Sequence, residues 1–203
     1  MIWKLLLPIL AALSHHSYFK PSAELLSKRP FSAIQQYNQP KRELPTYASL
    51  EPNIPTEYQK QKVRYALTQF IKTPGFDLLV KRMQQQREST IMGTLYELEA
   101  AIDLEKKGFE IVAFNQTYKA FDHICEIDIV ATDKNGQRCY IECKDISWSN
   151  CPKVKNQLLK QQAIIKELEE ENGSTGHMLC SKRPIPPAMR DWLRNQNIRI
   201  ATS

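Results

Sequence analysis

The sequence predicts an α/β fold with a mixed central sheet covered by helices. Short runs rich in β-branched and aromatic residues are typical of strands, and segments with apolar residues at helical spacing separate them. Asp133-Lys134-Asn135-Gly136 lies between two of these runs and is a strong hairpin signal. From Ile91 onward, the predicted order of elements is α-β-β-β-α-β-α-β.

The individual elements follow from periodicity and from helix-ending residues. Ser89 or Thr90 can cap a helix that Gly108 ends. Thr73-Pro74-Gly75 separates two earlier helices. The predicted helices are 56–72, 76–86, 91–107, 154–171 and 187–195, and the predicted strands are 109–114, 124–131, 138–144, 177–181 and 198–201.

Composition divides the 203 residues into a basic and a near-neutral part. With 42% apolar and 25% charged residues, the chain is neither disordered nor a multi-span membrane protein. Residues 1–90 hold 13 basic and 6 acidic side chains, whereas residues 91–203 hold 15 and 16. A basic extension beside an acid-bearing domain suits a polyanionic partner, although a solvated surface or a targeting segment would have the same charge.

The N-terminal third suggests a targeting segment and a linker. Residues 1–31 begin with an apolar stretch too short to span a bilayer and contain one acid and four basic residues. They fit a mitochondrial presequence or a short secretory signal, and an ordinary helix is the alternative. Residues 32–55 are rich in Pro, Gln and Asn, which predicts a linker, and 56–90 form a basic helical extension. Five cysteines, an odd number, favour a reducing final compartment.

The hairpin brings candidate catalytic residues together. With a three-residue loop and Gly136 in the left-handed conformation, Asp128 lies opposite Glu142. Lys144 then shares their face, because strand side chains alternate with a period of two. A two-residue loop would instead place Glu142 on the other face, so the site depends on the turn type.

Two close carboxylates are costly without a cation between them, and Mg²⁺ or Mn²⁺ is the natural occupant. Such an ion can activate water and stabilise charge on a phosphate, while Lys144 orients the water or neutralises the transition state. The residues therefore predict phosphodiester hydrolysis. A surface ion pair of Asp128, Glu142 and Lys144 is the structural alternative.

At these residues the sequence resembles the PD-(D/E)xK nuclease superfamily, in particular its restriction-endonuclease-like and Holliday-junction-resolvase-like members. The resemblance covers about residues 91–201, within a predicted nuclease-like domain at 91–203. The residues that match the superfamily pattern are Glu97 in a Gly-x-x-x-Glu-x-x-Ala helix, Asp128 on one strand, and Glu142-Cys143-Lys144 on the next. Ile127 stands where the superfamily name has Pro, and Cys125 where resolvase-like members usually have Gly.

The resemblance implies a restriction-endonuclease-like core and a Mg²⁺- or Mn²⁺-dependent endonuclease that acts on DNA rather than RNA. Metal ligands would be Glu97, Asp128 and Glu142, with Lys144 and Gln161 completing the catalytic set. Gln157 competes with Gln161, and a buried structural amide is the alternative for both. An RNA endonuclease, a secreted toxin-type nuclease and a catalytically inactive nucleic-acid-binding module are the rival functions, and the oligomeric state is open between monomer and homodimer.

The basic extension supplies the candidate nucleic-acid contacts. Its charge predicts that it binds phosphates without reading sequence. The residues are Lys60, Lys62, Arg64, Lys81, Arg82 and Arg87.

Overall fold

The computed structural model describes residues 35–36, 46–120, 123–173 and 175–201. All of them belong to one compact unit that spans Ala33–Ser203. The predicted targeting segment, residues 1–31, lies outside the described residues. In the described part of the chain, no helix is long and apolar enough to cross a membrane.

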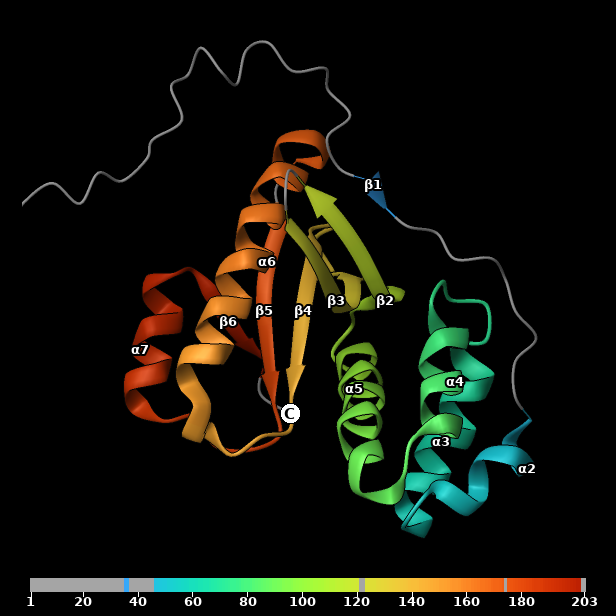
Figure 1. The fold of residues 1–203 in the computed structure, drawn as a ribbon. Helices are drawn as coiled ribbons and strands as arrows, with labels where there is room; N and C mark the ends of the chain where they lie inside the picture. The colour runs from blue at the N-terminus through green and yellow to red at the C-terminus, as the bar shows by residue number, and fades with distance from the viewer. Residues whose placement is uncertain (1–34, 37–45, 121–122, 174, 202–203) are drawn as a thin grey trace, which may run out of the picture. The chain divides into compact units, whose positions relative to one another are not determined.

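A run of helices is followed by three consecutive strands, and only after these do helices and strands alternate along the chain (Figure 1). The helices are α2 (Tyr47–Leu50), η1 (Glu51–Asn53), α3 (Glu57–Gln69), α4 (Phe76–Gln85), α5 (Glu88–Lys106), η2 (Trp148–Asn150), α6 (Cys151–Asn172) and α7 (Pro187–Asn195). The strands are β1 (Gln35–Gln36), β2 (Glu110–Ala120), β3 (His123–Thr132), β4 (Arg138–Lys144), β5 (Thr175–Ser181) and β6 (Ile198–Ala201).

The strands form one mixed sheet in the order β1-β2-β3-β4-β5-β6. The first four are antiparallel neighbours, and β4, β5 and β6 run parallel. Parallel neighbours need a crossover connection, which α6 and α7 provide. The predicted α/β class with a mixed sheet is therefore confirmed. The structure adds β1, α2, η1 and η2 to the predicted elements and extends β2 to Ala120.

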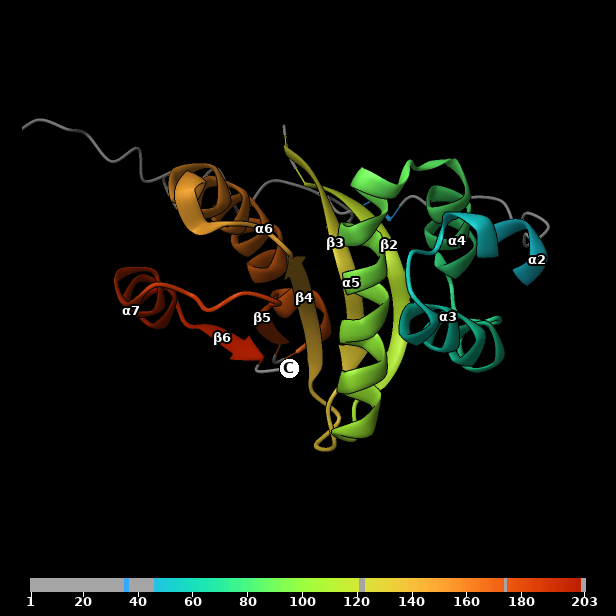
Figure 2. The same ribbon diagram turned by 90° about the horizontal axis from the view of Figure 1, so that it is seen from below.

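Helices cover both faces of the sheet (Figure 2). On one face, α5 packs with α3 and α4 in a core that includes Phe76, Leu98, Phe114 and Ile129. On the other face, α6 and α7 form two further clusters with residues that face away from α5. All five cysteines carry free thiols.

The N-terminal helices are part of the main core rather than a separate extension. Residues 46–55, within the segment expected to be a linker, form α2 and η1, and they bury Leu50 and Ile54. Val63 of α3 and Met83 of α4 lie in the same cluster as α5. Leu50 and Ile54 anchor this segment, because both are buried in the same core cluster as α5.

The hairpin between β3 and β4 has the predicted three-residue loop. Asp133 pairs with Gln137 through its backbone, and Gly136 has a φ of 79°. The Asp133 carboxylate also accepts hydrogen bonds from the N–H groups of Asn135 and Gln137. Paired residue numbers in β3 and β4 consequently add to 270, from Thr132–Arg138 to Ile129–Ile141.

A close backbone approach fixes α4 against β2. Phe114 N–H donates to the Pro74 carbonyl at 2.8 Å, and Gly75 has a φ of 78°. A Cβ atom at position 75 would lie 1.9 Å from the Phe114 carbonyl oxygen. Only glycine fits this contact, because both its conformation and its lack of a side chain are required.

We predict that Gly75→Ala destabilises the protein by about 3 kcal/mol or more, since it combines a backbone clash with a left-handed conformation. Gly108→Ala is the matched control: its φ is 87° but nothing lies within 4 Å of the added Cβ. It should cost about 1 kcal/mol. Urea unfolding measures the free energy of unfolding of both variants. Equal losses would show that the close approach of Gly75 to Phe114 adds no cost for a side chain.

A buried histidine should make stability depend on pH. Both ring nitrogens of His177 in β5 are buried without a hydrogen-bond partner, and burial lowers the pKa of His177 to about 4. The unfolded chain therefore binds this proton more readily than the folded one does. The contribution is fully present above about pH 6.5 and is lost as the pH falls toward 4.

We predict that the stability of the wild type decreases by up to about 3 kcal/mol more than that of His177→Leu between pH 6.5 and pH 4. The carboxyl groups titrate equally in both proteins. The difference between their free energies of unfolding in urea therefore isolates the contribution of His177. If the free energies of unfolding of the two proteins differ by the same amount at pH 6.5 and pH 4, His177 is protonated or hydrogen-bonded in the folded state.

Candidate active site

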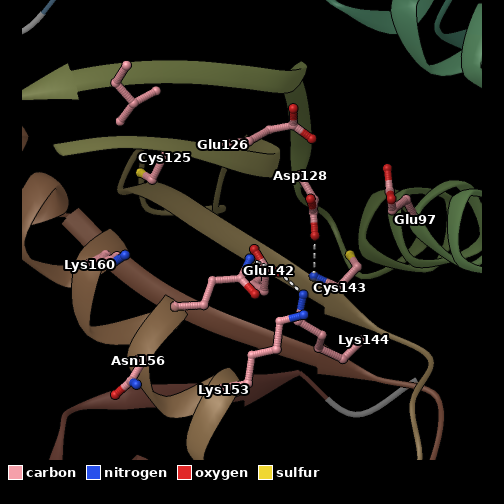
Figure 3. A pocket seen from close by; sticks show the side chains of 12 residues that line it. Glu97, Cys125, Glu126, Asp128, Glu142, Cys143, Lys144, Lys153, Asn156 and Lys160 are labelled. Carbon is pink, nitrogen blue, oxygen red and sulfur yellow. Dashed lines mark hydrogen bonds and ion pairs between the residues drawn. The ribbon is translucent and has the colours of Figure 1, made fainter.

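The site lies where β3 separates from β4. Backbone pairing between the two strands ends at Ile129–Ile141. Beyond it, the Asp128 carboxylate accepts a hydrogen bond from Cys143 N–H at 2.8 Å (Figure 3). The Asp128 side chain thus occupies the gap between the strands and satisfies a donor that would otherwise pair with the neighbouring backbone.

The alternation of side chains also changes at this point. Ile129 packs in the core on the α5 side, whereas Ile127 packs with the α6 cluster. The same change of face occurs on β2, where Phe114 packs on the α5 side and Tyr118 packs with the α6 cluster. Between them lies Asn115, which has a positive φ of 47°. Regular alternation alone therefore does not describe how Asp128 points, and the expected pairing of Asp128 with Glu142 lies just beyond the last paired residues, Ile129 and Ile141.

A cleft of about 720 Å³ opens at the separated strands. It brings together Glu97 from α5, Asp128 from β3, and Glu142 and Lys144 from β4 (Figure 3). Four of the predicted site residues therefore line one cavity. The remaining lining residues are Ile124, Cys125, Glu126, Cys143, Lys153, Asn156, Gln157 and Lys160.

Glu142 is held by three donors and is 1% exposed. Lys144 Nζ donates to its Oε1 atom, and Gln157 Nε2 donates to the same atom at 2.7 Å. Gln161 Nε2 donates to the other carboxylate oxygen and also to the Glu126 carbonyl at 2.9 Å. Gln161, which is fully buried, therefore bridges the two separated strands, and both predicted amides of α6 contact Glu142.

Glu97 is held by an arginine from outside the predicted nuclease-like domain. Arg82 of α4 donates to Glu97 Oε1 at 3.4 Å, to Asn115 Oδ1 at 2.8 Å and to Glu126 Oε1 at 2.9 Å. The second oxygen of Glu97, Oε2, is buried and has no hydrogen-bond partner. Arg82 was predicted to contact nucleic acid, but here its guanidinium lies within the acidic cluster.

Burial raises the pKa of the carboxyl groups in the cleft. The pKa of Glu97 rises to about 7, mainly because of burial, with Arg82 opposing the shift and Glu126 and Glu142 adding to it. Burial, then Glu142 and Glu97, hold the pKa of Asp128 well above its usual value. Burial lowers the pKa of Lys144, but Glu142 raises it, and the net direction is upward. The carboxylates repel one another, and Lys144 stays charged.

These residues fit a hard divalent cation by their chemistry. Carboxylate oxygens are its preferred ligands, and the unpartnered Glu97 Oε2 atom is an available one. Among the described residues, no three His, Cys, Asp or Glu side chains converge on one point that could hold a metal ion. Arg82, Lys144 and the α6 amides hold the acids instead, so an ion would have to replace some of these contacts.

The other predicted phosphate-binding residues lie on α3, on α4 and before α5. Lys60 pairs with Glu57, and Arg64 pairs with Glu51. Lys62 lies 4.0 Å from Asp103. Lys81 and Arg87 belong to the same basic region, and none of these five residues lines the cleft.

Sequence analysis missed the basic residues that do line the cleft, Lys153 and Lys160. Both are exposed and lie on α6, on the same side as Gln157. Residues three and four positions apart share a helix face, so the predicted role of Gln157 could have identified Lys160 and Lys153. Their Cα atoms are about 10 Å apart along the helix axis.

A scan against protein-family models finds no match, and a search of curated proteins finds no relative. Among solved structures, the chain is similar to a repair endonuclease from Pyrococcus abyssi, with 16% identity and a TM-score of 0.39 over 59% of this chain and 47% of the other. It is also similar to EndoMS in a complex with double-stranded DNA, with 16% identity and a TM-score of 0.38 over 52% and 42% of the two chains.

A third similar structure is Can2 from Sulfobacillus thermosulfidooxidans in complex with cyclic tetra-adenylate. The identity is 14% and the TM-score is 0.43, over 76% of this chain and 45% of that chain. In all three cases the chain spans less than half the length of the protein it matches. The function is therefore inferred from the cleft rather than from these partial overlaps.

We predict that Gln161→Leu destabilises the protein by about 2–3 kcal/mol, because it leaves a carboxylate oxygen of Glu142 and the Glu126 carbonyl without a buried donor. Gln162→Leu is the matched control. It removes one partly exposed hydrogen bond, to the Gln196 carbonyl, and should cost about 1 kcal/mol. Urea unfolding without divalent ions compares them, and equal losses would show that Gln161 does not bridge the strands.

Proposed function

We propose that this protein is a metal-dependent nuclease of the PD-(D/E)xK type that hydrolyses phosphodiester bonds, with DNA favoured over RNA. The observation that carries the proposal is the convergence of Glu97, Asp128, Glu142 and Lys144 on one cleft at the separation of β3 from β4. The order α5-β2-β3-β4-α6-β5 around this cleft supports the restriction-endonuclease-like core.

Glu97, Asp128 and Glu142 would hold Mg²⁺ or Mn²⁺, which supplies activation of water and stabilisation of charge on the phosphate. Lys144 lies beside Glu142 and is charged, so it can orient water or neutralise the developing negative charge. Gln157 and Gln161 fix the Glu142 carboxylate. Glu97, Asp128 and Glu142 are buried, so charge interactions with them are stronger than at an exposed surface.

Nucleic acid would bind along the α6 wall of the cleft. Lys153 and Lys160 flank the acidic cluster and are exposed, so their ammonium groups can contact phosphates on both sides of the scissile bond. The basic residues of α3 and α4 form a second candidate surface. Those of α3, Lys60, Lys62 and Arg64, already have acidic partners.

We predict that Glu142→Gln and Lys144→Met each lower the rate of cleavage by at least about 100-fold, because each removes an interaction with the reacting groups worth several kcal/mol. The assay incubates the purified protein with supercoiled, branched and single-stranded DNA and with RNA, in Mg²⁺, Mn²⁺ or EDTA. Circular dichroism verifies that each variant is folded.

Matched controls are Glu110→Gln, on the exposed start of β2, and Lys134→Met, in the hairpin loop. Both should cleave like the wild type. Cleavage by the wild type in EDTA, or by Glu142→Gln, would exclude the metal-dependent mechanism. Cleavage of RNA alone would reverse the substrate preference, and binding without cleavage would indicate an inactive nucleic-acid-binding protein.

We predict that the double variant Lys153→Ala/Lys160→Ala flattens the salt dependence of DNA binding by about 1.4–1.8 units of log–log slope, since each lost phosphate contact removes about 0.7–0.9. Lys60→Ala/Arg64→Ala changes the charge equally and should leave the slope nearly unchanged. Fluorescence anisotropy from about 50 to 200 mM salt gives both slopes. The opposite result would assign binding to the α3 surface.

A further inference from the structure

Arg82 is the only basic side chain of α4 with contacts to the acidic cluster among the described residues. Its Nη2 atom lies 2.8 Å from Asn115 Oδ1 and 2.9 Å from Glu126 Oε1, and its Nη1 atom lies 3.4 Å from Glu97 Oε1. The guanidinium thus joins α5, β2 and β3 at one point. Such a planar fork with fixed donors holds two carboxylates in a defined arrangement.

The acidic cluster and the cations that pair with it do not balance in charge. Glu97, Glu126, Asp128 and Glu142 carry four negative charges when ionised, and their two partners, Arg82 and Lys144, carry two positive charges. The formal charge of these six side chains is therefore −2, which one divalent cation neutralises. A second divalent cation would leave an excess of +2, in a cleft whose exposed α6 wall already carries Lys153 and Lys160, which is unfavourable.

The position of Arg82 matches this count. It lies between Glu97 and Glu126, two acids that could otherwise share a cation, and it occupies one oxygen of each. The other oxygen of Glu97 is buried and unpartnered, so it remains available to a single ion. Lys144 is the corresponding fixed charge at Glu142.

We propose that Arg82 is a positioning residue that takes the place of a second divalent cation, so that each chain binds one divalent ion. This inference rests on the proposed metal-dependent function. It also assigns the N-terminal helices to the site itself, because α4 supplies this fixed charge. Removing it lowers the formal charge of the remaining five side chains to −3 and frees oxygens of Glu97 and Glu126 for another ion.

The test counts Mn²⁺ bound per chain of the full-length protein by electron paramagnetic resonance of free Mn²⁺ during a titration. The wild type should bind one ion, and Arg82→Met, which keeps the aliphatic stem but not the charge, should bind two. Lys81→Met is the matched control, since it removes the same charge from the preceding position of α4, which points about 100° away. It should bind one ion, as should Arg82→Lys.

A compensating variant tests the charge balance itself. Arg82→Met/Glu126→Gln returns the formal charge to −2 and should again bind one ion; Glu126 is exposed, so its replacement by Gln is compatible with folding. Two ions bound to the wild type would overturn the proposal, even if Arg82→Met did not fold. One ion in both the wild type and folded Arg82→Met would overturn the role of Arg82 and leave the nuclease proposal intact. No Mn²⁺ bound to the wild type would overturn both.

Discussion

The hydrogen bond from Cys143 N–H to the Asp128 carboxylate is the interaction on which the arrangement of the cleft depends. It forms where the backbone pairing of β3 with β4 ends, and it replaces a backbone acceptor by a side chain. The two strands can therefore separate without leaving this buried donor unsatisfied. The space between them becomes the cleft, with Glu97 reaching it from one helix and Gln161 closing it from another.

Such a cleft concentrates negative charge in a region of low solvent exposure, which opposes folding unless cations or hydrogen-bond donors compensate. In this protein the compensation is internal: Arg82 pairs with Glu97 and Glu126, and Lys144 pairs with Glu142. Burial, and then the neighbouring carboxylates, nevertheless keep the pKa of Glu97 and of Asp128 above its usual value. A cation bound as proposed above would offset the cost of ionising these acids.

The helices that precede the core contribute to the site as well as to stability. The contact of Gly75 with Phe114 fixes the start of α4 beside β2, one residue before Asn115. Arg82, two turns further along α4, then reaches Asn115, Glu97 and Glu126. A segment that carries the positive charge of the sequence thereby places one of its charges inside the cleft rather than on an exposed surface.

The sequence by itself determined the α/β class, the mixed sheet and the hairpin register, because periodicity and turn chemistry are local properties. The Asn135-Gly136 turn set the pairing of β3 with β4 from Thr132–Arg138 to Ile129–Ile141, as predicted, and Asp128 and Glu142 follow the last pair. Strand alternation placed Lys144 beside these acids, whereas Glu97 and Gln161, with Gln157 as the competitor, were implied only by the resemblance.

Only the tertiary structure decided three other features: the packing of residues 46–55 into the core, the separation of β3 from β4, and the place of Arg82. Composition predicted a linker at 32–55 from its prolines and polar residues, and phosphate contacts in 56–90 from the positive charge. It could not show that Leu50 and Ile54 enter the core or that Arg82 pairs with Glu97 and Glu126. Which charges pair with one another depends on long-range packing, here that of α4 against β2 and of α6 across the sheet. No local pattern in the chain encodes those distances, so the charge balance of the cleft could not be derived before the fold was known.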